Sequence, residues 1–281
     1  MINKKKLYIR AVTAGIFGAV VIFLLNFNYW SAFAFLILVS FLTTYEYIKL
    51  QAGSEFNFFL LLISSFLFGP ELTILNEFWR PFNSNIFIVI LFIVLLYQLI
   101  LILNLFSDKY LNSYSRLLVY MRGLLYIGIP VALFHEIVMK EYGDIGMIFI
   151  LILLIWTNDT FAYLTGSIFG KHKLMPSVSP AKTIEGFIGG GLFTIIAAFI
   201  ISLFYNWGNI YFYILLAIIV WLMGTLGDLV ESKMKRSLGV KDSGDIMPGH
   251  GGFLDRFDSF IFVLPWVALL FYIGVFMKII N

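Results

Sequence analysis

The chain of 281 residues is 61% hydrophobic and only 12% charged, with a formal net charge of +3 and no cysteine. Soluble domains carry about 25% charged residues, so this composition excludes an ordinary soluble protein and favours an integral membrane protein. The absence of cysteine also excludes disulfides, zinc–thiolate sites and a thiol nucleophile.

Apolar runs long enough to cross a bilayer recur along the whole sequence. Since only helices suit runs of this length, they predict an all-α, polytopic membrane fold with about nine transmembrane helices. No soluble domain is left over, so we expect residues 1–281 to form a single integral membrane domain. The expected spans lie near residues 11–26, 29–47, 57–76, 85–106, 117–138, 146–168, 185–205, 209–229 and 254–277.

The basic residues predict an orientation. Three lysines at positions 4–6 and Arg10 precede the first apolar run. They could belong to a signal peptide, but no convincing cleavage site follows, so we expect an uncleaved first helix. With a cytoplasmic amino terminus, most Lys and Arg residues fall on the cytoplasmic side. The positive-inside rule therefore predicts a multi-pass protein of the cell membrane with its carboxy terminus on the outer side. The exceptions are Arg80, Lys140 and Lys278 outside, and Arg122 within a span.

The sixth expected span carries the first group of polar residues. Asn158, Asp159 and Thr160 are consecutive, and Tyr163 lies four residues after Asp159, on the same helical face. An acid within a span is a candidate functional residue. A buried hydrogen-bond cluster between helices is the alternative interpretation.

The segment before the seventh expected span has features of a helix start. Pro180 would lie in the first turn and Glu185 shortly after it. The amino terminus of such a helix, with Lys182 on it, would attract phosphate. The three glycines at 189–191 are expected to allow close packing of helices.

The end of the eighth span and the start of the ninth carry acids. Asp228, Glu231 and Ser232 share one helical face, and Asp255 and Asp258 are three residues apart. An ion pair of Asp228 with a following Lys or Arg is one interpretation. Close carboxylates repel unless cations lie between them, so a site for Mg²⁺, which takes its remaining ligands from substrate phosphates, is the interpretation we favour.

The loop between these two spans offers a complement to phosphate. Its cations could neutralise a polyphosphate, and glycines 249, 251 and 252 let backbone amides approach an anion. An ordinary basic loop bound to anionic lipid head groups would explain the cations, but not the acids or the Pro-Gly-His-Gly-Gly run. Whether His250 contacts phosphate or only the loop stays open. The cations are Lys233, Lys235, Arg236 and Lys241.

These segments resemble the signature of phosphatidate cytidylyltransferases (CDP-diacylglycerol synthases). Residues 232–258 read S-x-M-K-R-x4-K-D-x-G-x-x-x-P-G-H-G-G-x-L-D-R-x-D. Upstream, N-D-T-x-A-Y at 158–163, S-P-x-K-T-x-E-G at 179–186 and G-D-L-x-E-S at 227–232 match in order. Ala181 departs from the pattern, where a more polar residue is expected.

The resemblance implies Mg²⁺-dependent transfer of CMP from CTP to phosphatidic acid, giving CDP-diacylglycerol and pyrophosphate in phospholipid biosynthesis. It implies one or two divalent ions, with a second, different cation as a further possibility, and suggests a homodimer. The partners expected are CTP, phosphatidic acid and membrane lipids, with no nucleic acid. Residues 141–281 would form the catalytic half, and residues 1–140 mainly packing and lipid-facing helices.

The resemblance also assigns residues. The metal-binding acids would be Asp228, Asp255 and Asp258, with Asp159 a nearby candidate. The catalytic group would be Asp228, Asp255, Lys241 and Arg256, the two cations offsetting triphosphate charge. The remaining motif residues form a substrate-binding group without individual roles: Asn158, Asp159, Ser179, Lys182, Thr183, Glu185, Ser232, Lys233, Arg236, Asp242, His250, Gly251 and Gly252.

Two alternatives remain at this point. A related lipid nucleotidyltransferase or lipid kinase could use similar metal-binding and phosphate-binding residues on another substrate. An ion-coupled transporter is the other, since carboxylates within a membrane can mark an ion path; the gathering of the acids at one leaflet argues against it. The D-x-x-D-G-x-x-A-R run of CDP-alcohol phosphotransferases is missing from the sequence.

Overall fold

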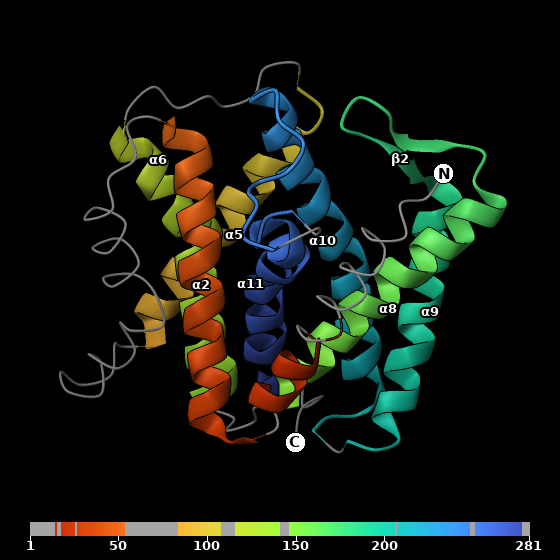
Figure 1. Cartoon of the computed structure of the whole chain (residues 1–281). Coiled ribbons are helices and arrows are strands. Elements are labelled where there is room, and N and C mark those ends of the chain that lie inside the picture. The colour runs from red at the N-terminus through yellow and green to blue at the C-terminus, as the bar shows by residue number, and fades with distance from the viewer. Residues whose placement is uncertain are drawn as a thin grey trace.

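The protein is a bundle of helices with one short β-hairpin (Figure 1). The computed structural model describes residues 15, 18–25, 27–53, 84–107, 116–140, 146–205, 207–247 and 251–276. In chain order its elements are α2 (Tyr29–Ala52), α5 (Ser84–Asn104), α6 (Arg116–Gly123), η2 (Leu124–Gly128), α7 (Ile129–Phe134), η3 (His135–Lys140), α8 (Gly146–Phe169), β1 (Lys173–Met175), β2 (Ser179–Thr183), α9 (Ile184–Ser202), α10 (Ile210–Ser237) and α11 (Leu254–Phe276).

Seven helical segments within the described ranges are long and apolar enough to cross a membrane. They confirm an all-α multi-pass membrane protein and seven of the expected spans. The predicted span at 57–76 lies outside the described residues, and the one at 11–26 lies only partly inside, where residues 18–25 are helical. The fifth expected span is one continuous helical run from α6 to η3. Its π-helical turns flank α7, whose second residue is Pro130; proline lacks an N–H and interrupts a regular helix.

Helix α11 is the centre of the bundle. In the most apolar stretch of α11, 78% of the residues are buried inside the protein, against 22% in the corresponding stretch of α5. In Figure 1 it lies between α2 and α10, and it also packs against α5 and α7. The polar residues at its amino-terminal end are therefore held by a buried, apolar helix.

Glycines bring the helices of the carboxy-terminal half close together. A Cβ on Gly189 would meet the Thr165 side chain of α8 at 2.2 Å, and one on Gly191 would meet the Trp221 ring of α10 at 2.3 Å. The predicted packing role of the run at 189–191 is confirmed, because α9 uses it to contact two neighbours.

The predicted helix start at 179–185 is wrong in its first part. Residues Ser179–Thr183 form β2, which pairs antiparallel with β1, and the helix begins at Ile184. Pro180 fits there because an edge strand does not need every N–H. The Thr183 side chain caps α9 by accepting the Gly186 N–H at 3.1 Å. The Glu185 carboxylate accepts the backbone N–H of Lys171 at 3.0 Å and so closes the hairpin against the helix.

The contact of α10 with α11 gives a stability prediction at Gly227. A Cβ there would meet the Phe262 Cβ at 2.5 Å, so Gly227→Ala should destabilise the protein by about 1–3 kcal/mol through overpacking. The thermal midpoint of the purified protein in detergent would measure this. Gly224→Ala, one turn away with its nearest neighbours at 3.8 Å, is the matched control and should leave the midpoint unchanged or raise it. Equal midpoints for the two variants would contradict the packing argument.

Candidate active site

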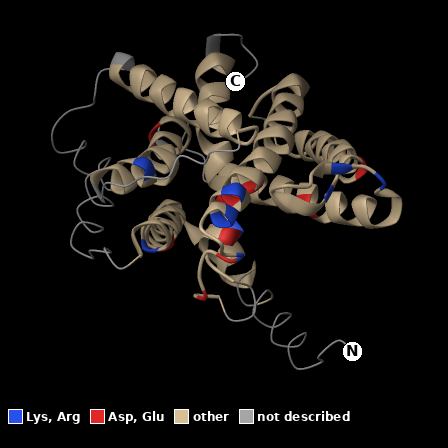
Figure 2. Ribbon diagram, turned by 90° about the horizontal axis from the view of Figure 1, so that it is seen from above, with Lys and Arg blue, Asp and Glu red and all other residues tan. Residues whose placement is uncertain are grey.

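A cavity of about 620 Å³ lies where α8, α10 and α11 meet the β-hairpin and the start of α9. The polar parts of the sixth, eighth and ninth expected spans, whose acids the sequence puts at one leaflet, thus meet at this cavity. Seen from above, many of the charged residues of the described helices lie near the centre of the bundle (Figure 2). The predicted site residues that line the cavity are Asn158, Asp159, Lys182, Thr183, Asp228, Asp242, Asp255, Arg256 and Asp258.

One group of charges in the cavity is centred on Asp228. Its carboxylate pairs with Lys182 Nζ at 2.7 Å and accepts the Ser232 hydroxyl at 3.1 Å. Asp159 and Asp258 interact electrostatically with Asp228 and with the same lysine. Lys182 therefore pairs directly with Asp228 and acts on the other two carboxylates at longer range, and Arg256 also acts on Asp159. The alternative interpretation of Asp228, an ion pair with a following Lys or Arg of α10, does not hold, because its cation is Lys182 of β2.

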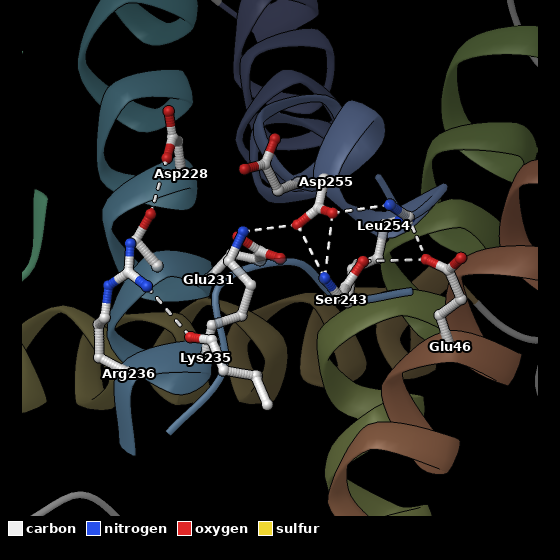
Figure 3. A network of polar contacts seen from close by, with 12 residues as sticks. Glu46, Asp228, Glu231, Lys235, Arg236, Ser243, Leu254 and Asp255 are labelled. Atoms are coloured by element: carbon white, nitrogen blue, oxygen red, sulfur yellow. Dashed lines mark hydrogen bonds and ion pairs between the residues drawn. The ribbon is translucent and has the colours of Figure 1, made fainter. Parts of the chain in front are cut away.

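The second group is centred on Asp255, the first-turn acid of α11 (Figure 3). Lys235 Nζ contacts Asp255 Oδ1 and Glu231 Oε2, each at 2.5 Å. Two backbone amides also donate to Asp255: Ser243 N–H at 3.0 Å and Gly252 N–H at 2.8 Å. This carboxylate therefore joins α10, α11 and the segment between them, residues 238–253, which we call the polar loop.

The glycines of the polar loop approach an anion, as the sequence predicts, but the anion in the structure is the protein's own. Gly252 donates to Asp255, and Gly251 has φ +84°, a conformation that favours glycine. A Cβ on Gly252 would meet the Ser243 hydroxyl and the Glu46 carboxylate. The loop is therefore folded tightly on side chains of the protein. Gly249 and His250 lie outside the described residues.

Other predicted residues lie away from the cavity lining. Lys233 Nζ donates to the Ser107 carbonyl at 2.9 Å, beyond the end of α5, and Arg236 donates to the Val240 carbonyl at 3.1 Å. Lys241 is exposed on the loop. The other predicted residues outside the lining are Ser179, Glu185, Ser232, Gly251 and Gly252.

Sequence reasoning missed Glu46 of α2, which is 2% exposed. Its Oε2 accepts the Ser243 hydroxyl at 3.0 Å and the Leu254 N–H at 2.7 Å. The signal that could have found it is a single acid within an otherwise apolar run. It brings the amino-terminal half of the chain to the polar loop.

The acids suit a hard divalent ion better around Asp228 than around Asp255. In the part of the chain that the structure describes, no three Asp, Glu or His side chains meet closely enough to hold an ion by themselves. Mg²⁺ commonly takes one or two carboxylates and completes its shell with water and substrate phosphates. The excess negative charge around Asp228 fits such a site, whereas the Asp255 oxygens already accept one ammonium group and two amides. A metal-binding role for any of these residues stays a prediction.

The fold and the cavity define a multi-pass membrane protein with an acid-rich cavity built by its carboxy-terminal helices. The chain belongs to the cytidylyltransferase family, whose model matches residues 8–274. It is 48% identical to the phosphatidate cytidylyltransferases of Staphylococcus epidermidis strain RP62A, Staphylococcus haemolyticus strain JCSC1435 and Staphylococcus aureus strain COL. Each of these matches extends over 146 residues, which is 52% of this chain and 55% of the relative. The chain thus matches about half the length of these curated relatives.

Proposed function

We propose that the protein is a phosphatidate cytidylyltransferase, transferring CMP from CTP to phosphatidic acid and releasing pyrophosphate. The observation that carries the proposal is a cavity in which acids and cations from β2, α10 and α11 face one another, in a chain of this family. The names of the staphylococcal relatives support the choice of CTP and phosphatidate.

The chemistry needs little from a general base. An oxygen of the lipid phosphate attacks the α-phosphorus of CTP, the bond to the β-phosphate breaks, and pyrophosphate leaves with the bonding electrons. A phosphomonoester is largely dianionic at neutral pH, so the nucleophile is already formed. The barrier lies in bringing anions together, and the protein lowers it by positioning and charge stabilisation.

The cations of the cavity lining would neutralise the negative charge of the bound phosphates. Lys182, Lys235 and Arg256 reach it from β2, α10 and α11. Lys182 pairs with Asp228 and Lys235 with Asp255, while Arg256 interacts electrostatically with Asp159. On binding, the triphosphate would compete for these cations. Arg256 would offer two parallel N–H donors, which suit phosphate oxygens.

Mg²⁺ is part of the proposal. Asp228, with Asp258 and Asp159 beside it, would hold the ion, and the ion would supply positive charge to the phosphate oxygens. The acyl chains of phosphatidic acid would stay in the bilayer while its head group enters the cavity. We further propose a cytoplasmic amino terminus, which puts the cavity on the side where CTP is made, and a homodimer as the assembly.

A radiolabel experiment tests the reaction. The purified protein in detergent is incubated with phosphatidic acid, Mg²⁺ and CTP labelled on either the α- or the γ-phosphate. We expect the α-label in the lipid, in amounts equal to the pyrophosphate released, and no γ-label in the lipid. Transfer of the γ-label would instead identify a lipid kinase. No labelled lipid from folded protein with any nucleotide or acceptor would refute group transfer to lipid altogether.

A further inference from the structure

Glu46 is the one buried acid that the described part of the amino-terminal half directs to the polar loop. Its Oε2 accepts two hydrogen bonds from across the bundle, one from the Ser243 hydroxyl and one from the Leu254 N–H. Its Oε1 is buried and has no hydrogen-bond partner among the described residues. Burial of a carboxylate with one oxygen unpaired is costly, so its presence in an apolar helix calls for an explanation.

The contact with Leu254 places the carboxylate at the amino terminus of α11. Leu254 is the first residue of that helix, and the first N–H groups of a helix have no partner within it. An acid there is favoured by the helix dipole. Glu46 therefore caps α11 from a different helix, and it does so one residue before Asp255.

The polar loop is packed around this carboxylate. A Cβ on Gly244 would meet Glu46 Oε1 at 2.6 Å, and a Cβ on Gly252 would meet Oε2 at 2.5 Å. Both glycines leave the room that the side chain fills. The polar loop thus packs closely against both carboxylate oxygens of Glu46.

The contacts continue from Glu46 to the cavity. Ser243 donates its hydroxyl to Glu46 and its backbone N–H to Asp255 (Figure 3). Asp255 in turn contacts Lys235, and both of these residues line the cavity. A shift of Glu46 would move Ser243, and with it the acid that holds Lys235.

We propose that Glu46 is a positioning residue for the cytidylyl transfer proposed above, on which this inference rests. It fixes the polar loop and the start of α11, so that Asp255 and Lys235 stand at the positions that the bound nucleotide requires. A helix of the amino-terminal half thereby sets the geometry of a cavity built by the carboxy-terminal half. Glu46 itself does not touch the reacting atoms.

The first measurement does not depend on activity. The chain has no cysteine, so Ile246→Cys, at an exposed position in the polar loop, carries a nitroxide label at a single site. Phe199→Cys, exposed on α9, provides a reference label in a separate preparation. We expect Glu46→Ala to increase the mobility of the label at 246 in the electron paramagnetic resonance spectrum and to leave the label at 199 unchanged. Increased mobility at both sites, or at neither, would overturn the proposal.

The second measurement is kinetic and uses the unlabelled chain. Glu46→Ala should lower kcat and raise KM for CTP, reducing kcat/KM by roughly 10- to 100-fold, because a small misplacement of positioned groups has effects of that size. Glu46→Gln keeps an acceptor oxygen for both donors and should stay within about fivefold of the wild type. Thr43→Ala is the matched control on α2: Thr43 is fully buried and bonds only to carbonyls of its own helix, so no change is expected.

A purely structural role predicts a different result. In that case kcat would fall only in proportion to the folded fraction, with KM for CTP unchanged, and this outcome would overturn the proposal. If Glu46→Ala does not fold, Ser243→Ala removes one of the two donors, and an unchanged label at 246 in that variant would overturn it equally. Absence of transfer in the wild type would refute the proposed function alone, since the label mobility still decides the role of Glu46.

Discussion

Replacing Asp255 by asparagine should reduce CMP transfer by roughly 100-fold, because its carboxylate positions one group from α10 and two from the polar loop. It contacts Lys235 and accepts the N–H groups of Ser243 and Gly252. An asparagine keeps one acceptor oxygen and turns an NH₂ group either toward the ammonium or toward the two amides. Either the Lys235 ammonium or the two backbone amides then face the NH₂ donor. The repelled groups move away, and the residues lining the cavity are no longer held in place. The initial rate of label transfer from α-labelled CTP measures the effect.

The control for this variant is Asp245→Asn, which makes the same chemical change at an exposed position of the same loop. It should transfer CMP at nearly the wild-type rate. Both proteins should be extracted from membranes in equal amounts, because the core of α11 is apolar and buried. Near-normal transfer by Asp255→Asn would remove Asp255 from the catalytic group.

The positions of seven spans along the chain could be predicted from the sequence because membrane spans are nearly local features. A run of apolar residues long enough to cross the bilayer must form a helix, whatever its neighbours are. The packing role of the glycine run of α9 could be predicted for a similar reason, since small residues in a span mostly serve close packing of helices. The convergence of the acids of α8, α10 and α11 followed from their common leaflet.

The pairing of the charges could not be predicted in this way. The lysine nearest to Asp228 in sequence belongs to the same helix, yet Lys182 reaches it from β2, while Lys235 pairs with Glu231 and Asp255. The β-hairpin causes this difference. The pattern at 179–185 contains the signals of a helix start, but pairing with β1 extends residues 179–183 and carries Lys182 over the cavity. Hydrogen bonding between the two strands is a tertiary interaction, and here it overrides the local preference of these residues for a helix start.

Glu46 shows a second limit of sequence reasoning. One acid in an apolar run marks a functional position, but its partner loop lies almost two hundred residues later, and nothing in the local pattern names it. The division of the chain into a packing half and a catalytic half, which remains a prediction, therefore has to include this contact across the two halves.

The largest effect on metal binding is expected from Asp228→Asn. Asp228 is the acid of its group that pairs directly with Lys182, and it interacts electrostatically with both Asp159 and Asp258. Removing its charge should weaken the binding of Mn²⁺, used as a spectroscopic substitute for Mg²⁺, and should lower transfer by roughly 100- to 1,000-fold, as loss of electrostatic stabilisation does in other enzymes. Free Mn²⁺ measured by electron paramagnetic resonance in the absence of CTP gives the affinity separately from the activity.

The opposite change in affinity is expected from Lys182→Met, and this contrast makes the assignment testable. In the structure the ammonium group of Lys182 lies where it neutralises Asp228, so it competes with a divalent ion for the same carboxylates. Its removal should tighten Mn²⁺ binding about tenfold, since one positive charge near the ion is lost. The same variant should raise KM for CTP, because a cation facing the triphosphate is missing. Unchanged or weaker Mn²⁺ binding in Lys182→Met would mean that the ion is held elsewhere. Asp255 would then return as its candidate ligand, because this predicted metal-binding acid pairs with Lys235 in place of Lys182.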